Sequence, residues 1–188
     1  IVGVKSVVIP NAWDCDDGWN EIKNCGSPDK WKRIFWSGGA SHAADWEVCF
    51  DAISEIMTER DNVRLTIMGF LPPCIDTNRN LPQFKGRIEF QGFSEPETYY
   101  ETIHGIRADV GIAPIRETTF NTSKSAIKFL EYSLIGMPTV ASDWAPYNQV
   151  IVDKKNGRLV KTKEEWKKAI CFYLDKGDKS KEMIEQAR

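Results

Sequence analysis

Short apolar segments alternate along this chain with longer segments of helical periodicity, and this alternation limits the possible folds more than any other feature. The apolar segments cover residues 32–39, 62–69, 87–93, 108–114 and 138–142, with a possible last strand at 157–160. Strands that are short and continuously apolar, and that are separated by helices, are typical of a parallel sheet covered on both faces. The sequence therefore predicts a doubly wound, Rossmann-like α/β fold.

Helical patterns fill the intervals between these strands. A helix is predicted over residues 43–61, where apolar side chains recur at spacings of three and four. A second is predicted over 94–107, with Ser94 as the N-cap and Glu97 completing a capping box. Two C-terminal helices are predicted over 163–177 and 178–188, and the polar segment 71–86 is expected to be a loop with a short helical turn.

Charge and cysteine content exclude several kinds of partner. The 25 basic and 27 acidic residues give a net charge of −2, which does not favour nucleic acid or an anionic membrane as the main partner. The five cysteines form no C-x-x-C pair and only two histidines exist, so no metal site is predicted and the thiols are expected to be buried and reduced. No apolar run approaches the length of a membrane span, and we expect a cytoplasmic protein.

Ligands of such sheets bind outside the carboxyl ends of the strands. The first strand ends in Ser37, Gly38 and Gly39, the second in Gly69, and the third in Gly92 and Phe93. Glycine loops of this kind allow a phosphate to approach backbone N–H groups closely. The chain contains neither G-x-G-x-x-G nor G-x-x-x-x-G-K-[ST], which disfavours a nicotinamide dehydrogenase or a P-loop nucleotidase.

A helix that carries two lysines follows the fourth strand. It is predicted to begin near Asn121 and to end at Gly136, with Asn121, Thr122 or Ser123 as its cap and the N–H groups of Ser123 to Ser125 free. Lys124, Lys128 and Glu131 would share one stripe, while Ile127, Leu130 and Leu134 would face the sheet. Two ammonium groups at the positive end of a helix dipole suit a polyanion such as a diphosphate, although a solvated surface is an equally good explanation.

Three other polar residues lie near these strand ends. His42 follows the glycine loop, where a structural role is more common than a functional one. Arg116 and Glu117 precede the lysine helix. They are placed to contact sugar or phosphate, but charged residues on a surface loop more often have no such role.

The segment "ADVGIAPIRETTFNTSKSAIKFLEYSLIGMPTVASDWAPYNQVI", followed by "NGRLV", resembles the donor-binding half of family 4 retaining glycosyltransferases, which have two Rossmann domains in the GT-B fold. "VIPNAWD" resembles the crossover between the two domains, "IFWSGGASHAADW" the first strand and loop of the second domain, and "KTKEEWKKAI" its late helix. The resemblance implies a crossover at residues 1–30 and a nucleotide-sugar-binding domain at 31–188. The chain starts in a strand-like run without Met and stops within a helical pattern, so we expect a fragment that lacks an N-terminal acceptor domain.

The resemblance also implies roles for individual residues. Glu131 matches the glutamate that binds the nucleoside ribose, and Lys124 or Lys128 matches basic groups near the diphosphate. The Gly38–Gly39 loop would lie close to the phosphates, and Gly92–Phe93 near the base. Many members carry a second glutamate seven residues before the first, but Ser123 stands there in this chain, so the sugar contacts are open.

The expected function is transfer of a sugar from a nucleotide diphosphate sugar to an acceptor with retained configuration. The expected partners are this donor and the absent first domain, through which peripheral membrane contact is possible. No metal or other cofactor is expected, because lysines and backbone amides would neutralise the diphosphate. Two alternatives remain: half of a nucleotide-sugar epimerase, and a non-catalytic module that binds a nucleotide sugar.

Overall fold

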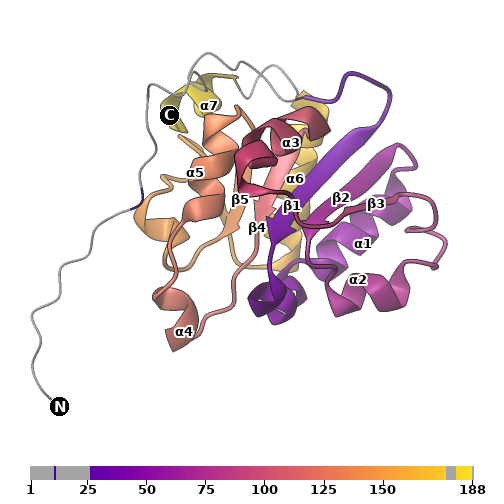
Figure 1. Ribbon diagram of the computed structural model, residues 1–188, viewed down its shortest axis with the longest axis horizontal. Helices are drawn as coiled ribbons and strands as arrows, with labels where there is room; N and C mark the ends of the chain where they lie inside the picture. The colour runs from indigo at the N-terminus through magenta and orange to yellow at the C-terminus, as the bar shows by residue number, and fades with distance from the viewer. Residues whose placement is uncertain (1–10, 12–25, 177–180, 188) are drawn as a thin grey trace, which may run out of the picture.

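The computed structural model describes residue 11, residues 26–176 and residues 181–187 (Figure 1). Its centre is a six-stranded sheet in the order β3-β2-β1-β4-β5-β6, and every neighbouring pair of strands is parallel. The strands are β1 (Lys32–Gly38), β2 (Val63–Gly69), β3 (Ile88–Gln91), β4 (Val110–Ala113), β5 (Thr139–Ser142) and β6 (Arg158–Val160). The predicted doubly wound α/β fold is confirmed. Most of the crossover predicted at residues 1–30 lies outside the described residues, as do Cys15 and Cys25.

Helices cover both faces of the sheet. On one face pack α1 (Phe50–Glu59), α2 (Pro73–Asn78) and α6 (Lys163–Lys176), and on the other pack α3 (Tyr99–Ile106) and α5 (Ile127–Leu134) (Figure 1). The side chains of β1 show why both faces are apolar: Ile34 and Trp36 belong to the core under α1 and α6, whereas Phe35 belongs to the core under α3 and α5. All three are fully buried, as expected for a central parallel strand. The described part of the chain contains no helix with the length and apolar character to cross a bilayer.

The prediction of one helix over residues 43–61 is only partly correct. A 3₁₀ helix, η2 (Ala40–Val48), comes first, and the α-helix starts at Phe50 after Cys49, whose φ of −128° interrupts the regular backbone. In a 3₁₀ helix, residues three apart lie directly above one another. His42 and Asp45 are therefore aligned on one side of η2. Cys49 is buried and Cys74 and Cys171 are partly buried, and all three are free thiols.

The lysine helix is not continuous, which corrects the prediction. A single turn, α4 (Thr119–Thr122), ends before Lys124, and α5 begins only at Ile127. The face of α5 that packs on the sheet also differs from the prediction: Ile127 is 37% exposed, whereas Lys128 is buried. The prediction that Ile127 packs on the sheet was wrong, and Lys124 lies on the linker between the helices rather than in a first helical turn. The end of the helix is as predicted, since Gly136 adopts a positive φ of 72° just after it.

The capping box predicted at Ser94 and Glu97 is absent from the described structure. A short 3₁₀ turn, η3 (Pro96–Thr98), comes before α3, and neither helix has a side-chain cap. The hydroxyl of Ser94 instead lies 3.2 Å from the hydroxyls of Thr98 and Thr102. The short helical turn expected within residues 71–86 is present as α2.

Gly111 on β4 is required by the close packing of α5 on the sheet. A Cβ atom at this position would lie 2.7 Å from Cε2 of Tyr132 and 3.0 Å from the sulfur of Met137. We expect Gly111→Ala to lower the free energy of unfolding by about 1–3 kcal/mol, because neither buried neighbour has room to move. Urea unfolding of the two proteins measures this difference.

Gly105→Ala is the matched control. Gly105 lies inside α3, and a Cβ added there would have no atom within 4 Å, so alanine should be neutral or stabilise by up to about 1 kcal/mol. Equal stabilities of the Gly111→Ala variant and the wild type would contradict the close contact of Tyr132 with β4.

Candidate functional site

The carboxyl ends of β1 and β2 are joined by a backbone hydrogen bond and form the floor of the site. The N–H of Phe70 donates to the carbonyl of Gly38 at 2.8 Å. Gly69 has a φ of +94°, and a Cβ there would approach the Gly38 carbonyl oxygen to 2.6 Å. A side chain at Gly38 would in turn meet the ring of Trp36 at 2.6 Å. These contacts explain why both strands end in glycine.

A cavity of about 380 Å³ opens above these glycines. It brings together seven residues that the sequence predicted for the site: Ser37, Gly38, Gly39, Gly69, Phe93, Lys128 and Glu131. His42, Tyr99 and Ile127 also line it. The cavity therefore combines the glycine loop after β1, the end of β2 and the first turns of α5, where the positive end of the helix dipole lies.

Lys128 is the basic residue of the cavity wall. Only 5% of its surface is exposed, and its Nζ lies 3.0 Å from Nε2 of His42. Burial lowers the pKa of Lys128 to about 8; Glu131 and Asp45 act in the opposite direction, and Lys124 in the same one. Burying an ammonium without a carboxylate in contact is costly, which is more typical of a functional group than of a structural one.

Glu131 lies one helical turn further along α5, on the same face as Lys128. Its Oε2 accepts a hydrogen bond of 2.9 Å from the hydroxyl of Tyr99, while no described residue donates to its Oε1. Burial raises the pKa of Glu131, and the Tyr99 hydrogen bond and the charge of Lys128 partly offset this effect. One carboxylate oxygen is thus held in place and the other is available to a ligand.

The tyrosine beside Glu131 is itself held by β1. Its hydroxyl lies 3.2 Å from Oγ of Ser37, and the N–H of Ser37 donates to the hydroxyl of Tyr132 at 3.2 Å. Ser37 therefore contributes to the site by orienting the two tyrosines. Tyr99 was not recognised from the sequence, although the aromatic pair Tyr99–Tyr100 at the start of a helix is visible there.

Lys124 does not line the cavity, in contrast to its predicted place beside Lys128. From the α4–α5 linker its Nζ lies 3.6 Å from Oδ2 of Asp45 and 3.3 Å from Nδ1 of His42. It therefore stands behind His42, on the side away from Lys128. The predicted stripe of Lys124, Lys128 and Glu131 holds only for the last two residues.

Asp45 is the main residue of this region that the sequence did not reveal. It is 2% exposed, and its carboxylate lies 2.8 Å from Nδ1 of His42. It also accepts hydrogen bonds from the N–H of Arg116 at 3.0 Å and from Nδ2 of Asn121 at 2.9 Å. Burial raises the pKa of Asp45, but the hydrogen bonds and Lys124 outweigh burial and lower it to about 2. The H-x-x-D spacing after the glycine loop was the available signal.

The remaining predicted residues lie outside the cavity. Asn121 is 4% exposed and donates to Asp45 and to the carbonyl of Arg116, so it supports the site from behind. Gly92 and Ser123 are exposed and do not contribute to the cavity wall. Ser125 is also exposed and accepts a hydrogen bond of 2.9 Å from Asn11.

The two loop charges before α4 are also outside the cavity. The backbone N–H of Arg116 holds Asp45, and its guanidinium lies 3.4 Å from Glu47. Glu117 is exposed. Neither side chain lines the cavity.

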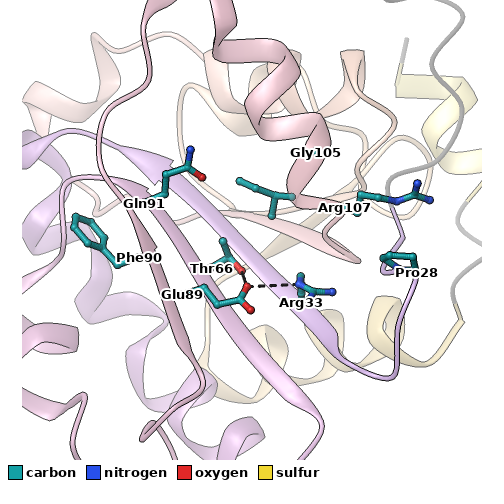
Figure 2. Close-up of a pocket in the computed structure, with 9 residues that line it drawn as sticks. Pro28, Arg33, Thr66, Glu89, Phe90, Gln91, Gly105 and Arg107 are labelled. Atoms are coloured by element: carbon teal, nitrogen blue, oxygen red, sulfur yellow. Dashed lines mark hydrogen bonds and ion pairs between the residues drawn. The ribbon is translucent and has the colours of Figure 1, made fainter.

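A second cavity, of about 400 Å³, lies between the end of α3 and side chains of β1, β2 and β3 (Figure 2). Glu89 in its wall accepts a hydrogen bond of 2.7 Å from Thr66 and pairs with Arg33 at 3.5 Å. Glu89 is thus already paired within this cavity. Arg33 and Glu89 also lie near the amino ends of their strands, whereas the first cavity has an unpaired carboxylate oxygen at the carboxyl ends. We therefore assign the functional site to the first cavity.

Among the described residues, no three histidine, cysteine or carboxylate side chains are grouped to hold a metal ion. The cationic groups near the cavity are Lys128 on its wall and Lys124 behind it. Together with the N–H groups at the start of α5, they favour a ligand with negative charge. The free oxygen of Glu131 adds an acceptor for a hydroxyl group.

Comparisons with known proteins agree with this fold. The chain resembles the crystal structure of TarM with a TM-score of 0.67 and 14% identity, over 89% of this chain and 33% of TarM. It resembles HepE from Anabaena, solved in complex with UDP-glucose, with a TM-score of 0.65 and 14% identity, over 84% of this chain and 43% of HepE. The chain therefore spans less than half the length of these two proteins.

A third structure is the C-terminal domain of LpcC, a glycosyl transferase group 1 family protein from Francisella tularensis. The match has a TM-score of 0.59 and 13% identity and covers 89% of this chain and 93% of that domain. No curated protein matches the chain. The sequence profile of glycosyl transferases group 1 matches residues 32–176. Since this match covers most of its length, the chain belongs to the glycosyl transferases group 1 family.

Proposed function

We propose that this chain is the donor-binding, C-terminal domain of a family 4-like retaining glycosyltransferase, and that its cavity binds a nucleotide diphosphate sugar. The observation that carries the proposal is Lys128, a buried ammonium on the wall of a cavity floored by Gly38 and Gly69. Two likenesses support it: HepE was solved with UDP-glucose, and the LpcC structure that this chain nearly covers is a C-terminal domain.

In this proposal the diphosphate lies between the glycine loop after β1 and the start of α5. Lys128 contacts it directly, and Lys124 adds positive charge from behind His42. Negative charge grows on the diphosphate as the bond from the sugar to its oxygen breaks. A fixed ammonium and fixed N–H groups stabilise that charge without reorganisation, and no metal is invoked.

The nucleoside lies on the other side of the cavity. The free Oε1 of Glu131 accepts hydrogen bonds from the ribose hydroxyls, and Phe93, which is 76% exposed, contacts the base. The acceptor site belongs to a further domain of the whole protein. Sugar transfer by the full-length protein, with retained configuration, would distinguish the proposal from an epimerase or a non-catalytic binding module.

Calorimetric titration of the chain with UDP, GDP and ADP tests donor binding. At least one should bind with a dissociation constant of roughly micromolar to millimolar magnitude. Lys128→Met should weaken that diphosphate about tenfold or more and leave the parent nucleoside nearly unchanged, because only the diphosphate meets the ammonium.

Lys155→Met is the matched control for this loss of charge, because Lys155 is exposed and precedes β6 at the opposite edge of the sheet. The Lys155→Met variant should bind the same nucleoside diphosphate as tightly as the wild type does. Absence of binding by all three nucleotides, or equal losses for nucleotide and nucleoside, would contradict the proposed role of Lys128.

Glu131→Gln tests the ribose contact. The amide keeps an oxygen that accepts the Tyr99 hydrogen bond but loses the charged acceptor, so nucleoside affinity should fall about tenfold. The melting temperature should change by no more than about 2 °C. Glu164→Gln, an exposed change on α6, is the control, and unchanged nucleoside binding by Glu131→Gln would rule out the ribose contact.

Lys128→Met should also stabilise the protein at neutral pH. Its pKa of about 8 lies below the ordinary 10.5, so the charged form is penalised in the folded state, by about 3 kcal/mol on this basis. Loss of the hydrogen bond to His42 takes back about 1 kcal/mol. We expect a net gain in the free energy of unfolding on the order of 1–2 kcal/mol at pH 7.

The pH dependence gives this prediction its check. Between about pH 8 and 10.5 the unfolded wild type binds more protons than the folded one, so wild-type stability rises relative to the variant. Urea unfolding of both proteins at pH 7 and pH 10 should show the gain shrinking. A variant that is less stable than the wild type at pH 7 would mean that the lysine stem, rather than the charge, determines stability here.

A further inference from the structure

His42 lies in a line between a buried carboxylate and a buried ammonium. Its Nδ1 is 2.8 Å from Oδ2 of Asp45, and its Nε2 is 3.0 Å from Nζ of Lys128. The three groups come from two elements far apart in sequence, η2 and α5. Among the described residues, only His42 forms a hydrogen bond with Nζ of Lys128, and the ring of Trp36 also lies near this ammonium, with its centroid 6.0 Å away.

The two contacts together define the protonation state of the ring. An ionised carboxylate only accepts hydrogen bonds, so Nδ1 carries the hydrogen that faces Asp45. An ammonium only donates, so Nε2 faces Lys128 with its lone pair. The neutral ring with its hydrogen on Nδ1 satisfies both neighbours. The ammonium of Lys124 also lies 3.3 Å from Nδ1, and its acceptor in this arrangement is Oδ2 of Asp45. A protonated ring would direct an N–H at the ammonium and lose the hydrogen bond.

Asp45 is in turn held by groups from the opposite side of the site. The N–H of Arg116 and Nδ2 of Asn121 both donate to Oδ1, which leaves Oδ2 for His42 and Lys124. The carboxylate therefore has a fixed orientation before any ligand enters. The ring of Trp36 lies edge-to-face with His42, and the two ring centroids are 6.4 Å apart.

We propose that Asp45 and His42 are positioning residues for the pyrophosphate group of the donor. Asp45 holds His42 in the tautomer with its hydrogen on Nδ1, and Nε2 then anchors the Lys128 ammonium at the cavity wall. One of the three N–H groups of Lys128 is used in this way, and two remain for phosphate oxygens. The inference rests on the proposed donor site, whose chemistry it specifies.

Acid should release the anchor. The charged groups around His42 are Asp45, Lys124 and Lys128. The negative charges of Glu131 and Asp45 raise the pKa of Lys128 and so favour its charged form. The hydrogen bond to Asp45 raises the pKa of His42, but burial and the charges of the two lysines outweigh it, so this pKa lies below its ordinary value. The anchor is therefore intact at neutral pH and is lost when the pH falls below the pKa of His42.

Imidazole nitrogen spectra of the chain without nucleotide test the anchor directly. The chain has only two histidines, and His104→Gln assigns the signals of His42 by difference. At pH 7.5 His42 should be neutral with its hydrogen on Nδ1. Lys128→Met should raise the pKa of His42, because it removes a nearby positive charge. A hydrogen on Nε2 in the wild type, or an unchanged pKa in the variant, would overturn the proposal.

Binding of UDP, GDP or ADP, whichever binds the wild type, tests the functional consequence. His42→Leu removes the acceptor for Lys128 and should weaken binding about tenfold. His42→Gln places an amide oxygen near the position of Nε2 and should retain more affinity. His104→Gln should bind as the wild type does. Wild-type affinity in a folded His42→Leu variant would overturn the proposal.

The two experiments separate failure of the inference from failure of the donor site. If the wild type binds none of the nucleotides, the proposed function fails, and the nitrogen spectra still decide whether His42 anchors Lys128. If a nucleotide binds, but the His42 variants bind it as tightly as His104→Gln does, the donor site stands and the anchor is overturned.

Discussion

The rest of the site depends on the hydrogen bonds that the carboxylate of Asp45 accepts. It is buried under the carboxyl edge of the sheet and connects segments that the chain places far apart: η2, the loop after β4, α4 and the α4–α5 linker. A buried charge is tolerated only where donors surround it, and here Arg116, Asn121 and His42 provide them. These hydrogen bonds fix the loops at this edge relative to one another. They also position His42, which in turn contacts Lys128.

The layers of the fold could be predicted because each strand and most helices carry their own signal. The buried parts of β1, β2, β4 and β5 are mostly apolar, and a central parallel sheet gives them no alternative place. The break between α4 and α5 could not be predicted, since residues 121–126 contain neither proline nor glycine. Next to the break, the side chain of Asn121 bonds Asp45 and the carbonyl of Arg116, contacts that exist only in the folded protein.

The site was predictable to the same extent. Glycines at strand ends, and Lys128 and Glu131 at the start of a helix, follow from the topology and from the resemblance, and the structure brings them around one cavity. Lys124 was displaced by the helix break. Tyr99 and Asp45 depend largely on partners from other elements, so the Tyr99–Tyr100 pair and the H-x-x-D spacing did not by themselves reveal their roles. Tertiary hydrogen bonds decide such positions, whereas periodicity decides the fold.

The hydrogen bond between Phe70 and Gly38 has a consequence for how the site can diverge. It joins the ends of β1 and β2, so the floor of the cavity is shaped before a ligand arrives, and little ordering entropy would be lost on binding of the proposed donor. Phe93 stands beside this rigid floor on an exposed loop with few neighbours. Under the proposed function, changes at Phe93 would alter base preference while the phosphate cradle stays intact, so relatives could exchange nucleotides without rebuilding the catalytic edge.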